Sequence, residues 1–290
     1  MQPILADLLH LLKLERIEDN IFRGESRDIG SPRVFGGQVL GQALSAASAT
    51  VEDAREVHSL HAYFLRAGDV EAGIVYEVDR ARDGKSFSNR RVTAIQHGRQ
   101  IFNMTASFQA REQGLEHQCA MPEVPPPESL SDMRELTAAV LEVIPEKMHR
   151  YFTHERPFEV RPIKPVALLS AEKAEPRQLF WFKAVDRLPD DPELHRNLLA
   201  YVSDYQLVAT STLPHGVRFE KGTLQLASLD HAMWFHRPFR IDDWLLYSMD
   251  SPNACGARGL ARGEIFSRDG VLVASTAQEG LIRIWDSDGD

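Results

Sequence analysis

Residues 58–65 read His-Ser-Leu-His-Ala-Tyr-Phe-Leu, and residues 228–235 repeat this pattern as Ser-Leu-Asp-His-Ala-Met-Trp-Phe. The match continues downstream, where Tyr-Glu-Val-Asp at 76–79 corresponds to Tyr-Ser-Met-Asp at 247–250 in the second half. Segments that recur in the same order indicate an internal duplication, which constrains the whole fold. The sequence therefore predicts two copies of one structural unit.

A helical segment precedes the repeated stretch in each half. The two segments cover residues 36–50 and 197–212, and their alignment places Gln42 and Asp204 at the same position. The two copies thus carry different polar residues at matching places. We expect one copy to keep the chemistry and the other to support it.

Composition limits the classes of protein to consider. The 290 residues suit one large domain or two of ordinary size, and 43% hydrophobic with 26% charged residues is typical of a soluble globular protein. A net charge of −9 argues against general nucleic-acid binding, which needs a basic surface. Two cysteines, Cys119 and Cys255, form neither a metal-binding spacing nor a disulfide framework. No apolar run approaches the roughly 20 residues of a membrane span, and no signal peptide is indicated, so we expect a cytoplasmic protein.

The chain divides at a proline-rich segment, residues 121–128, whose prolines exclude a helix or a central strand. We predict an N-terminal unit over 1–118, a linker with a short helix over 119–150, and a C-terminal unit over 151–290. The last unit opens with an edge strand between 158 and 169. Each unit combines a helix of about four turns with several strands of alternating pattern, which predicts an antiparallel α+β layer structure.

Several separate motifs resemble, in order and spacing, those of the acyl-CoA thioesterase II family. They are Gly36-Gly37-Gln38, the segments 58–69 and 82–87, Ser228-Leu229-Asp230-His231, and Gln278-Glu279-Gly280. The resemblance implies the α+β double hot-dog fold, in which two antiparallel sheets each wrap a long central helix and the units join face to face. It also implies hydrolysis of fatty acyl-CoA to free fatty acid and coenzyme A. No cofactor is expected, because the sequence shows neither a metal-binding constellation nor a nucleotide-binding loop. A homo-oligomer is expected, because the outer faces of hot-dog sheets often pair.

Asp204 lies on an otherwise apolar helical stripe, with Ala200 and Leu207 at helical spacing. A carboxylate there costs desolvation unless it is paired or hydrogen-bonded. Desolvation raises the pKa of an acid and donors lower it, and the sequence leaves open which effect dominates. One interpretation places Asp204 at the edge of the stripe, facing solvent. Its alignment with Gln42 favours a polar group on a buried helix instead.

Ser228 ends a predicted strand over 223–228, and Gln278 lies in the last predicted strand. Taken alone, a serine in a strand is most often structural. The resemblance implies a catalytic network of an aspartate, a threonine or serine, and a glutamine, which maps onto Asp204, Ser228 and Gln278. One base with two neutral orienting groups suits the activation of water. No Gly-x-Ser-x-Gly motif for a serine nucleophile is present.

The first copy offers Gln42, His58 and Ser107 at the three matching places. Gln42 cannot act as a base, so this half is not expected to run the same reaction. His58 fits either a base beside a pocket or, as we prefer, a hydrogen-bonded histidine of the sheet. The helix start at Gly36 and Gly37 fits an oxyanion site by the resemblance, or equally a tight turn.

Two other functions are considered beside the thioesterase. A hot-dog enoyl-CoA hydratase needs an Asp and His pair close in sequence near a helix start, and no such pair occurs near Asp204. A non-catalytic acyl-CoA-binding module is expected to lack the polar trio. The densest basic cluster fits either the phosphates of coenzyme A or a solvated face. It consists of Arg80, Arg82, Lys85, Arg90 and Arg91.

Overall fold

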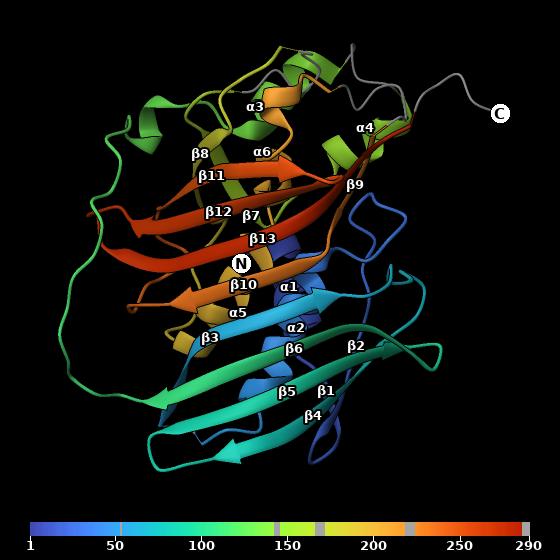
Figure 1. Ribbon diagram of the computed structural model, residues 1–290, viewed down its shortest axis with the longest axis vertical. Coiled ribbons are helices and arrows are strands. Elements are labelled where there is room, and N and C mark those ends of the chain that lie inside the picture. The colour runs from blue at the N-terminus through green and yellow to red at the C-terminus, as the bar shows by residue number, and fades with distance from the viewer. Residues whose placement is uncertain (53, 142–145, 166–171, 218–223, 286–290) are drawn as a thin grey trace.

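The chain forms a large antiparallel sheet that curves around central helices (Figure 1). The computed structural model describes residues 1–290 except 53, 142–145, 166–171, 218–223 and 286–290. In this described part, the helices are α1 (Pro3–Leu12), α2 (Gly36–Ser48), α3 (Met133–Val140), α4 (Glu146–Thr153), α5 (Pro192–Ser203) and α6 (Leu207–Thr210), with short 3₁₀ turns at Pro127–Ser129 and Leu213–His215. The strands are β1 (Glu15–Glu18), β2 (Ile21–Gly24), β3 (Arg55–Phe64), β4 (Ile74–Asp83), β5 (Phe87–Gln96), β6 (Arg99–Ala110), β7 (Phe158–Pro162), β8 (Arg177–Ala184), β9 (Leu224–Ser228), β10 (Asp230–Phe235), β11 (Leu245–Cys255), β12 (Arg258–Ser267) and β13 (Leu272–Ile284).

The order of the strands confirms the internal duplication. From the middle of the sheet outward, the first unit reads β3-β6-β5-β4-β2-β1 and the second reads β10-β13-β12-β11-β8-β7, with β9 paired to β13. In each unit the central helix, α2 or α5, comes between the corresponding strands in the chain. The predicted α+β double hot-dog architecture is therefore confirmed.

The two units meet edge to edge. Strands β3 and β10 pair so that His61 lies opposite Ala232 and Ala62 opposite His231, which brings the two repeated segments side by side. The units were expected to join face to face, but they share one continuous 13-stranded sheet. Pairing the two edge strands satisfies backbone groups that would otherwise stay exposed at each edge.

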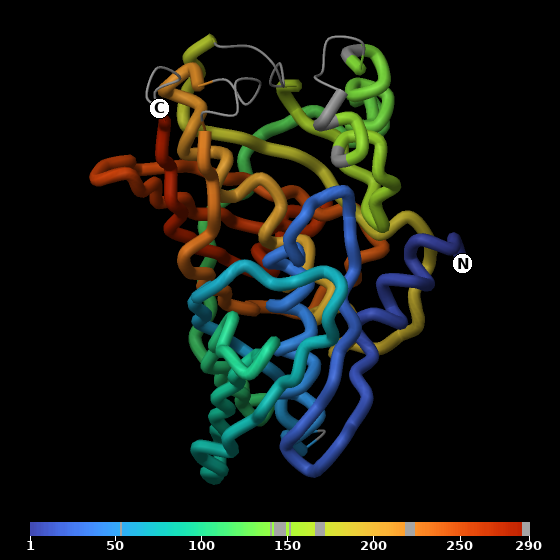
Figure 2. Tube along the Cα trace, turned by 90° about the vertical axis from the view of Figure 1, so that its right-hand side faces the viewer, coloured from blue at the N-terminus to red at the C-terminus, as the bar shows by residue number. Residues whose placement is uncertain are grey.

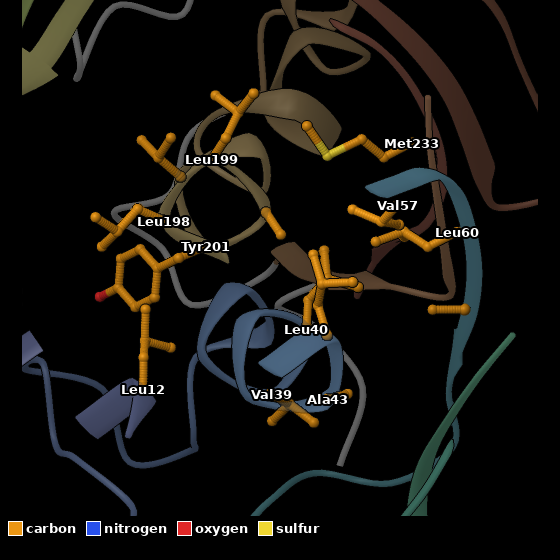
Figure 3. Close-up of a cluster of buried hydrophobic side chains, with 14 of the residues drawn as sticks. Leu12, Val39, Leu40, Ala43, Val57, Leu60, Leu198, Leu199, Tyr201 and Met233 are labelled. Atoms are coloured by element: carbon orange, nitrogen blue, oxygen red, sulfur yellow. The ribbon is translucent and has the colours of Figure 1, made fainter. Parts of the chain in front are cut away.

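The two central helices pack against each other inside the sheet. Leu40 of α2 and Leu198 and Leu199 of α5 belong to one buried cluster, and Figure 3 shows Leu40 on the side of α2 that faces Leu60 of the sheet. Nearly the whole length of α2 is buried, and its small residues allow the close approach. One hydrophobic core thus continues through both units.

The helix predicted over 197–212 is wrong in its extent. Helix α5 begins earlier, at Pro192, where the Asp191 side chain caps it, and it ends at Ser203. Gln206 then adopts a left-handed φ of 62°, which breaks the helix before α6. Asp204 therefore follows the last turn of α5, whereas Gln42 lies in the middle of α2, so the two are not at equivalent positions.

Helices α3 and α4, which follow the proline-rich linker, cover one end of the second unit (Figures 1 and 2). Helix α1 lies on the same side of the sheet as α2 and α5. The helix predicted over 130–146 appears as α3, followed by α4; residues 142–145 of that prediction lie outside the described residues. Strand β7 confirms the predicted edge strand, because it ends the sheet order; residues 166–171 are again outside the described part. None of the described helices is long and apolar enough to cross a membrane.

Candidate active site

The carboxylate of Asp204 lies at the centre of a hydrogen-bonded cluster. Its Oδ1 accepts from Nε2 of Gln278 on β13 at 2.7 Å and from Oγ of Ser228 on β9 at 3.4 Å. Its Oδ2 accepts from the backbone N–H of Gly37 at the start of α2, at 3.0 Å. The structure thus brings together the three side chains selected from the sequence, and it adds a backbone donor from the other unit.

Both glycines at the start of α2 are explained by close approach. A Cβ on Gly36 would lie 2.7 Å from Oδ2 of Asp204, and one on Gly37 would lie 2.1 Å from the backbone oxygen of Tyr201. The Gly37 N–H, considered above as an oxyanion donor, is used by the Asp204 carboxylate in this structure. The positive end of the α2 dipole therefore faces this carboxylate.

Burial raises the pKa of Asp204 from 3.8 to about 6, although the hydrogen bonds from Gln278, Gly37 and Ser228 lower it in part. Desolvation therefore outweighs the hydrogen bonds in setting the pKa of Asp204, a balance that the sequence alone left open. The side chain is half-buried, so one part of it still reaches the pocket described below. A carboxylate whose pKa is close to the working pH is suited to general base catalysis.

We expect kcat/KM to rise with pH through about 6 and to level off above that value, because Asp204 must be ionised to accept a proton. Below its pKa the carboxyl group holds a proton, so activity falls as the pH falls. Initial rates at low substrate concentration, measured from about pH 4.5 to about pH 8, give this profile. A kcat/KM that stays level down to the acidic end of this range, as an aspartate with the ordinary pKa of 3.8 would give, would contradict the assignment.

A pocket of about 160 Å³ opens beside Asp204. Its aromatic walls include Phe35, Phe158, Phe180 and Tyr205, and the rings of Phe35 and Tyr205 pack edge to face at 5.5 Å. Further lining side chains come from α3, α4, the segment after α4, and β7. The carboxylate thus borders a largely apolar hollow.

His231 is a site residue that the sequence did not single out. Its ring is fully buried, with Nδ1 at 3.2 Å from Nε2 of Gln278 and Nε2 at 3.0 Å from Oγ of Ser203. Burial lowers the pKa of His231 to about 3, so the ring is neutral at physiological pH. Its signals in the sequence were a place in the repeated segment, where His61 of the first copy is exposed, and the motif Ser228-Leu229-Asp230-His231.

Gln42 has a structural role. It is fully buried, its Oε1 accepts from the hydroxyl of Tyr76 at 2.7 Å, and its Nε2 donates to the backbone oxygens of Leu11 and Glu25. All of these contacts tie α2 to neighbouring segments of the first unit. From the sequence Gln42 was expected only to be unable to act as a base, so its part in holding α2 in place is a finding of the structure.

His58 and Ser107 are not the counterparts of Ser228 and Gln278. Nε2 of His58 lies 2.9 Å from Oγ of Ser107, and both side chains are only half-buried. Burial alternates along β6, so Ser107 points to the face opposite that of its buried neighbours, whereas Gln278 is buried on the helix side of β13. The preferred interpretation of His58, a hydrogen-bonded histidine of the sheet, agrees with this geometry.

Arg90 does not belong to an exposed basic cluster. Its side chain is 2% exposed, and its guanidinium donates to Thr50 beyond the end of α2 and to Asp83. It also donates to the backbone oxygen of Arg82. This arginine therefore stabilises the first unit and is not available to a coenzyme A phosphate.

Comparisons with known proteins give consistent matches along most of the chain. Residues 23–109 match the family model of the acyl-CoA thioesterase N-terminal domain, and residues 147–281 match that of acyl-CoA thioesterase. Acyl-CoA thioesterase 2 of Haemophilus influenzae is 47% identical over 283 residues, which cover 98% of this chain and 99% of the relative. The crystal structure of the acyl-CoA thioesterase II TesB2 from Mycobacterium marinum has a TM-score of 0.79 at 43% identity, covering 96% of this chain and 99% of the other. A hot-dog protein from Alicyclobacillus acidocaldarius, with a TM-score of 0.77 at 20% identity over 96% of this chain and 98% of the other, shows likeness of fold alone.

Proposed function

The chain belongs to the acyl-CoA thioesterase family, and on this premise we propose that it hydrolyses fatty acyl-CoA to a free fatty acid and coenzyme A by direct attack of water on the thioester carbonyl. The observation that carries the proposal is the position of Asp204. Its carboxylate borders an apolar pocket, receives hydrogen bonds from neutral donors, and has a raised pKa. These are the properties of a general base that activates water.

In this mechanism Asp204 accepts a proton from water while the water oxygen forms a bond to the carbonyl carbon. The C–S bond of the tetrahedral intermediate then breaks, and the proton held by Asp204 passes to the departing thiolate of coenzyme A. Ser228 and Gln278 orient the carboxylate and the water. Oε1 of Gln278 is buried without a hydrogen-bond partner in the described part of the chain, so it is free to accept the second hydrogen of the water.

We assign the acyl chain to the aromatic-walled pocket. Phe35, Phe158 and Phe180 offer it apolar surface next to Asp204. Each methylene that moves from water into such surroundings contributes about 0.8 kcal/mol. A chain seated there places its thioester near the carboxylate.

Release of free thiol from a panel of acyl-CoA chain lengths tests the function.

We expect Ser228→Ala to lower kcat by up to about 10²-fold, since the carboxylate and the water lose an orienting hydroxyl. The matched change Ser107→Ala removes a hydroxyl on the outer face of the sheet and should leave kcat unchanged. Equal losses in the two variants would argue against the site. Hydration of an enoyl-CoA without thiol release would favour the hydratase instead.

We expect no acyl-enzyme to accumulate. Ser228 is the one hydroxyl of the trio, and its Oγ lies 3.4 Å from Asp204, so a covalent route deserves a direct test. The thiolate of coenzyme A leaves readily, and splitting the reaction into two steps gains little. Rapid quenching followed by intact-mass measurement reports any adduct. A mass increase of one acyl group, absent in Ser228→Ala, would overturn direct water attack.

We also propose that the chain forms a homo-oligomer. Large apolar side chains on the outer face of the sheet support this proposal, among them Tyr63 and Phe87, which are 58% and 42% exposed.

Two further proposals concern the location and the division of the chain. We propose that the protein is cytoplasmic and that the unit boundaries lie near residues 118 and 150. The free thiols of Cys119 and Cys255 suit a reducing compartment. A single-chain mass in light scattering, or secretion of the protein in cell fractionation, would contradict these proposals. A first cut outside residues 119–150 in limited proteolysis would contradict the proposed boundaries.

A further inference from the structure

We propose that His231 is a positioning residue that sets the orientation of the Gln278 side-chain amide and, through it, the place of the attacking water. The inference rests on the proposed function, in which Asp204 and Gln278 hold that water. His231 itself is fully buried, so it acts through Gln278 and not on the substrate.

The protonation of the His231 ring follows from its partner on α5. The hydroxyl of Ser203 donates its one hydrogen to the backbone oxygen of Ala200 at 2.9 Å, so its oxygen can only accept from His231. Nε2 of His231 therefore carries the ring hydrogen, and Nδ1 presents a lone pair. The burial that keeps this ring neutral leaves that lone pair available at physiological pH.

That lone pair determines which way the amide of Gln278 faces. Nε2 of Gln278 has two hydrogens, and its two acceptors are Oδ1 of Asp204 at 2.7 Å and Nδ1 of His231 at 3.2 Å. A flipped amide would set Oε1 against both acceptors at once, which is repulsive. In the observed orientation Oε1 stays unpaired and can accept a hydrogen from water.

The network has a second anchor at Ser203. The hydroxyl of Tyr247 on β11 donates to the backbone oxygen of Ser203 at 2.8 Å, and burial raises the pKa of Tyr247 so that it stays protonated. The hydrogen bonds therefore continue from Tyr247 through Ser203 and His231 to Gln278 and Asp204. A buried network in which each member is bonded holds its side chains in one arrangement.

The experiment compares two substitutions of His231 with one of His61. His231→Leu keeps similar bulk but removes the acceptor, whereas His231→Asn can place an amide oxygen where Nδ1 lies. We expect His231→Leu to lower kcat by up to about 10²-fold with little change in KM, and His231→Asn to restore much of the loss. His61→Leu, at the exposed histidine of the other repeated segment, should leave kcat unchanged.

The pH profile separates positioning from a general loss of packing. The hydrogen bond from Gln278 lowers the pKa of Asp204, so losing its orientation should move the acidic limb of kcat/KM to higher pH in His231→Leu. If that variant fails to fold, Ser203→Ala, which removes the acceptor of the ring hydrogen, should show a smaller shift in the same direction.

Wild-type kcat and an unmoved acidic limb in folded His231→Leu would overturn the inference, and so would an unmoved limb in Ser203→Ala when His231→Leu does not fold. If these outcomes are found and Asp204→Asn is inactive in the same assay, only the inference about His231 fails and the proposed function stands. If Asp204→Asn is active, the proposed function itself fails.

Discussion

Replacing Asp204 by asparagine is expected to lower kcat by about 10²- to 10⁴-fold, the usual contribution of a general base. The amide has nearly the shape of the carboxylate but cannot accept the proton of the attacking water. Substrate binding should change much less, because the pocket walls are formed largely by other side chains, aromatic ones among them. Steady-state kinetics with an acyl-CoA substrate, followed by thiol release, measures both quantities.

Asp230→Asn is the matched control for this substitution. Asp230 is also half-buried, and burial also raises its pKa, but its carboxylate accepts from the backbone N–H of Glu279 and is not part of the trio. We expect this variant to keep its turnover. Near-wild-type turnover in a folded Asp204→Asn protein would remove the basis of the proposed mechanism.

Replacing Gly37 by alanine is expected to destabilise the protein, although alanine is favoured over glycine in a helix by about 1 kcal/mol. The new Cβ would lie 2.1 Å from the backbone oxygen of Tyr201 and 2.4 Å from the ring of Phe35. Neither the α5 backbone nor the packed aromatic ring can yield without moving the helices apart. Overpacking of this kind costs about 1–3 kcal/mol, and more where backbone must shift.

Thermal unfolding measures this loss as a Tm lowered by several degrees, since about 1 kcal/mol corresponds to roughly 2–4 °C in a protein of this size class. Activity should fall as well, because moving the start of α2 would displace the backbone N–H at position 37 that donates to Asp204. Gly114→Ala is the control, since no atom lies within 4 Å of its added Cβ. A Tm for Gly37→Ala equal to or above that of the wild type would show that the helices tolerate the added methyl group.

The sequence by itself determined the duplication and the α+β class, and its resemblance to the acyl-CoA thioesterase II family implied the double hot-dog fold and the three side chains that meet at the site. These properties are encoded in local patterns: the repeated segments, the strand alternation, and motifs that keep their order along the chain. The edge strand after the linker was predictable from such patterns as well. Each depends on residues that are close in sequence or on the comparison of two copies.

The tertiary structure decided which partners these residues meet. Asp204 binds Gln278 and Gly37, which lie 74 and 167 residues away, and no local pattern states such a contact. The break of the helix before Gln206 and the buried position of His231 depend on how α5 packs against the sheet.

The misassigned counterparts in the first copy have a related cause. A shift of one residue along a strand turns a side chain from the inner to the outer face, so an alignment of two distant copies does not reveal which face Ser107 occupies. Only tertiary packing decides which face of a strand is buried, because the free energy of burying that face is summed over the whole sheet and both central helices.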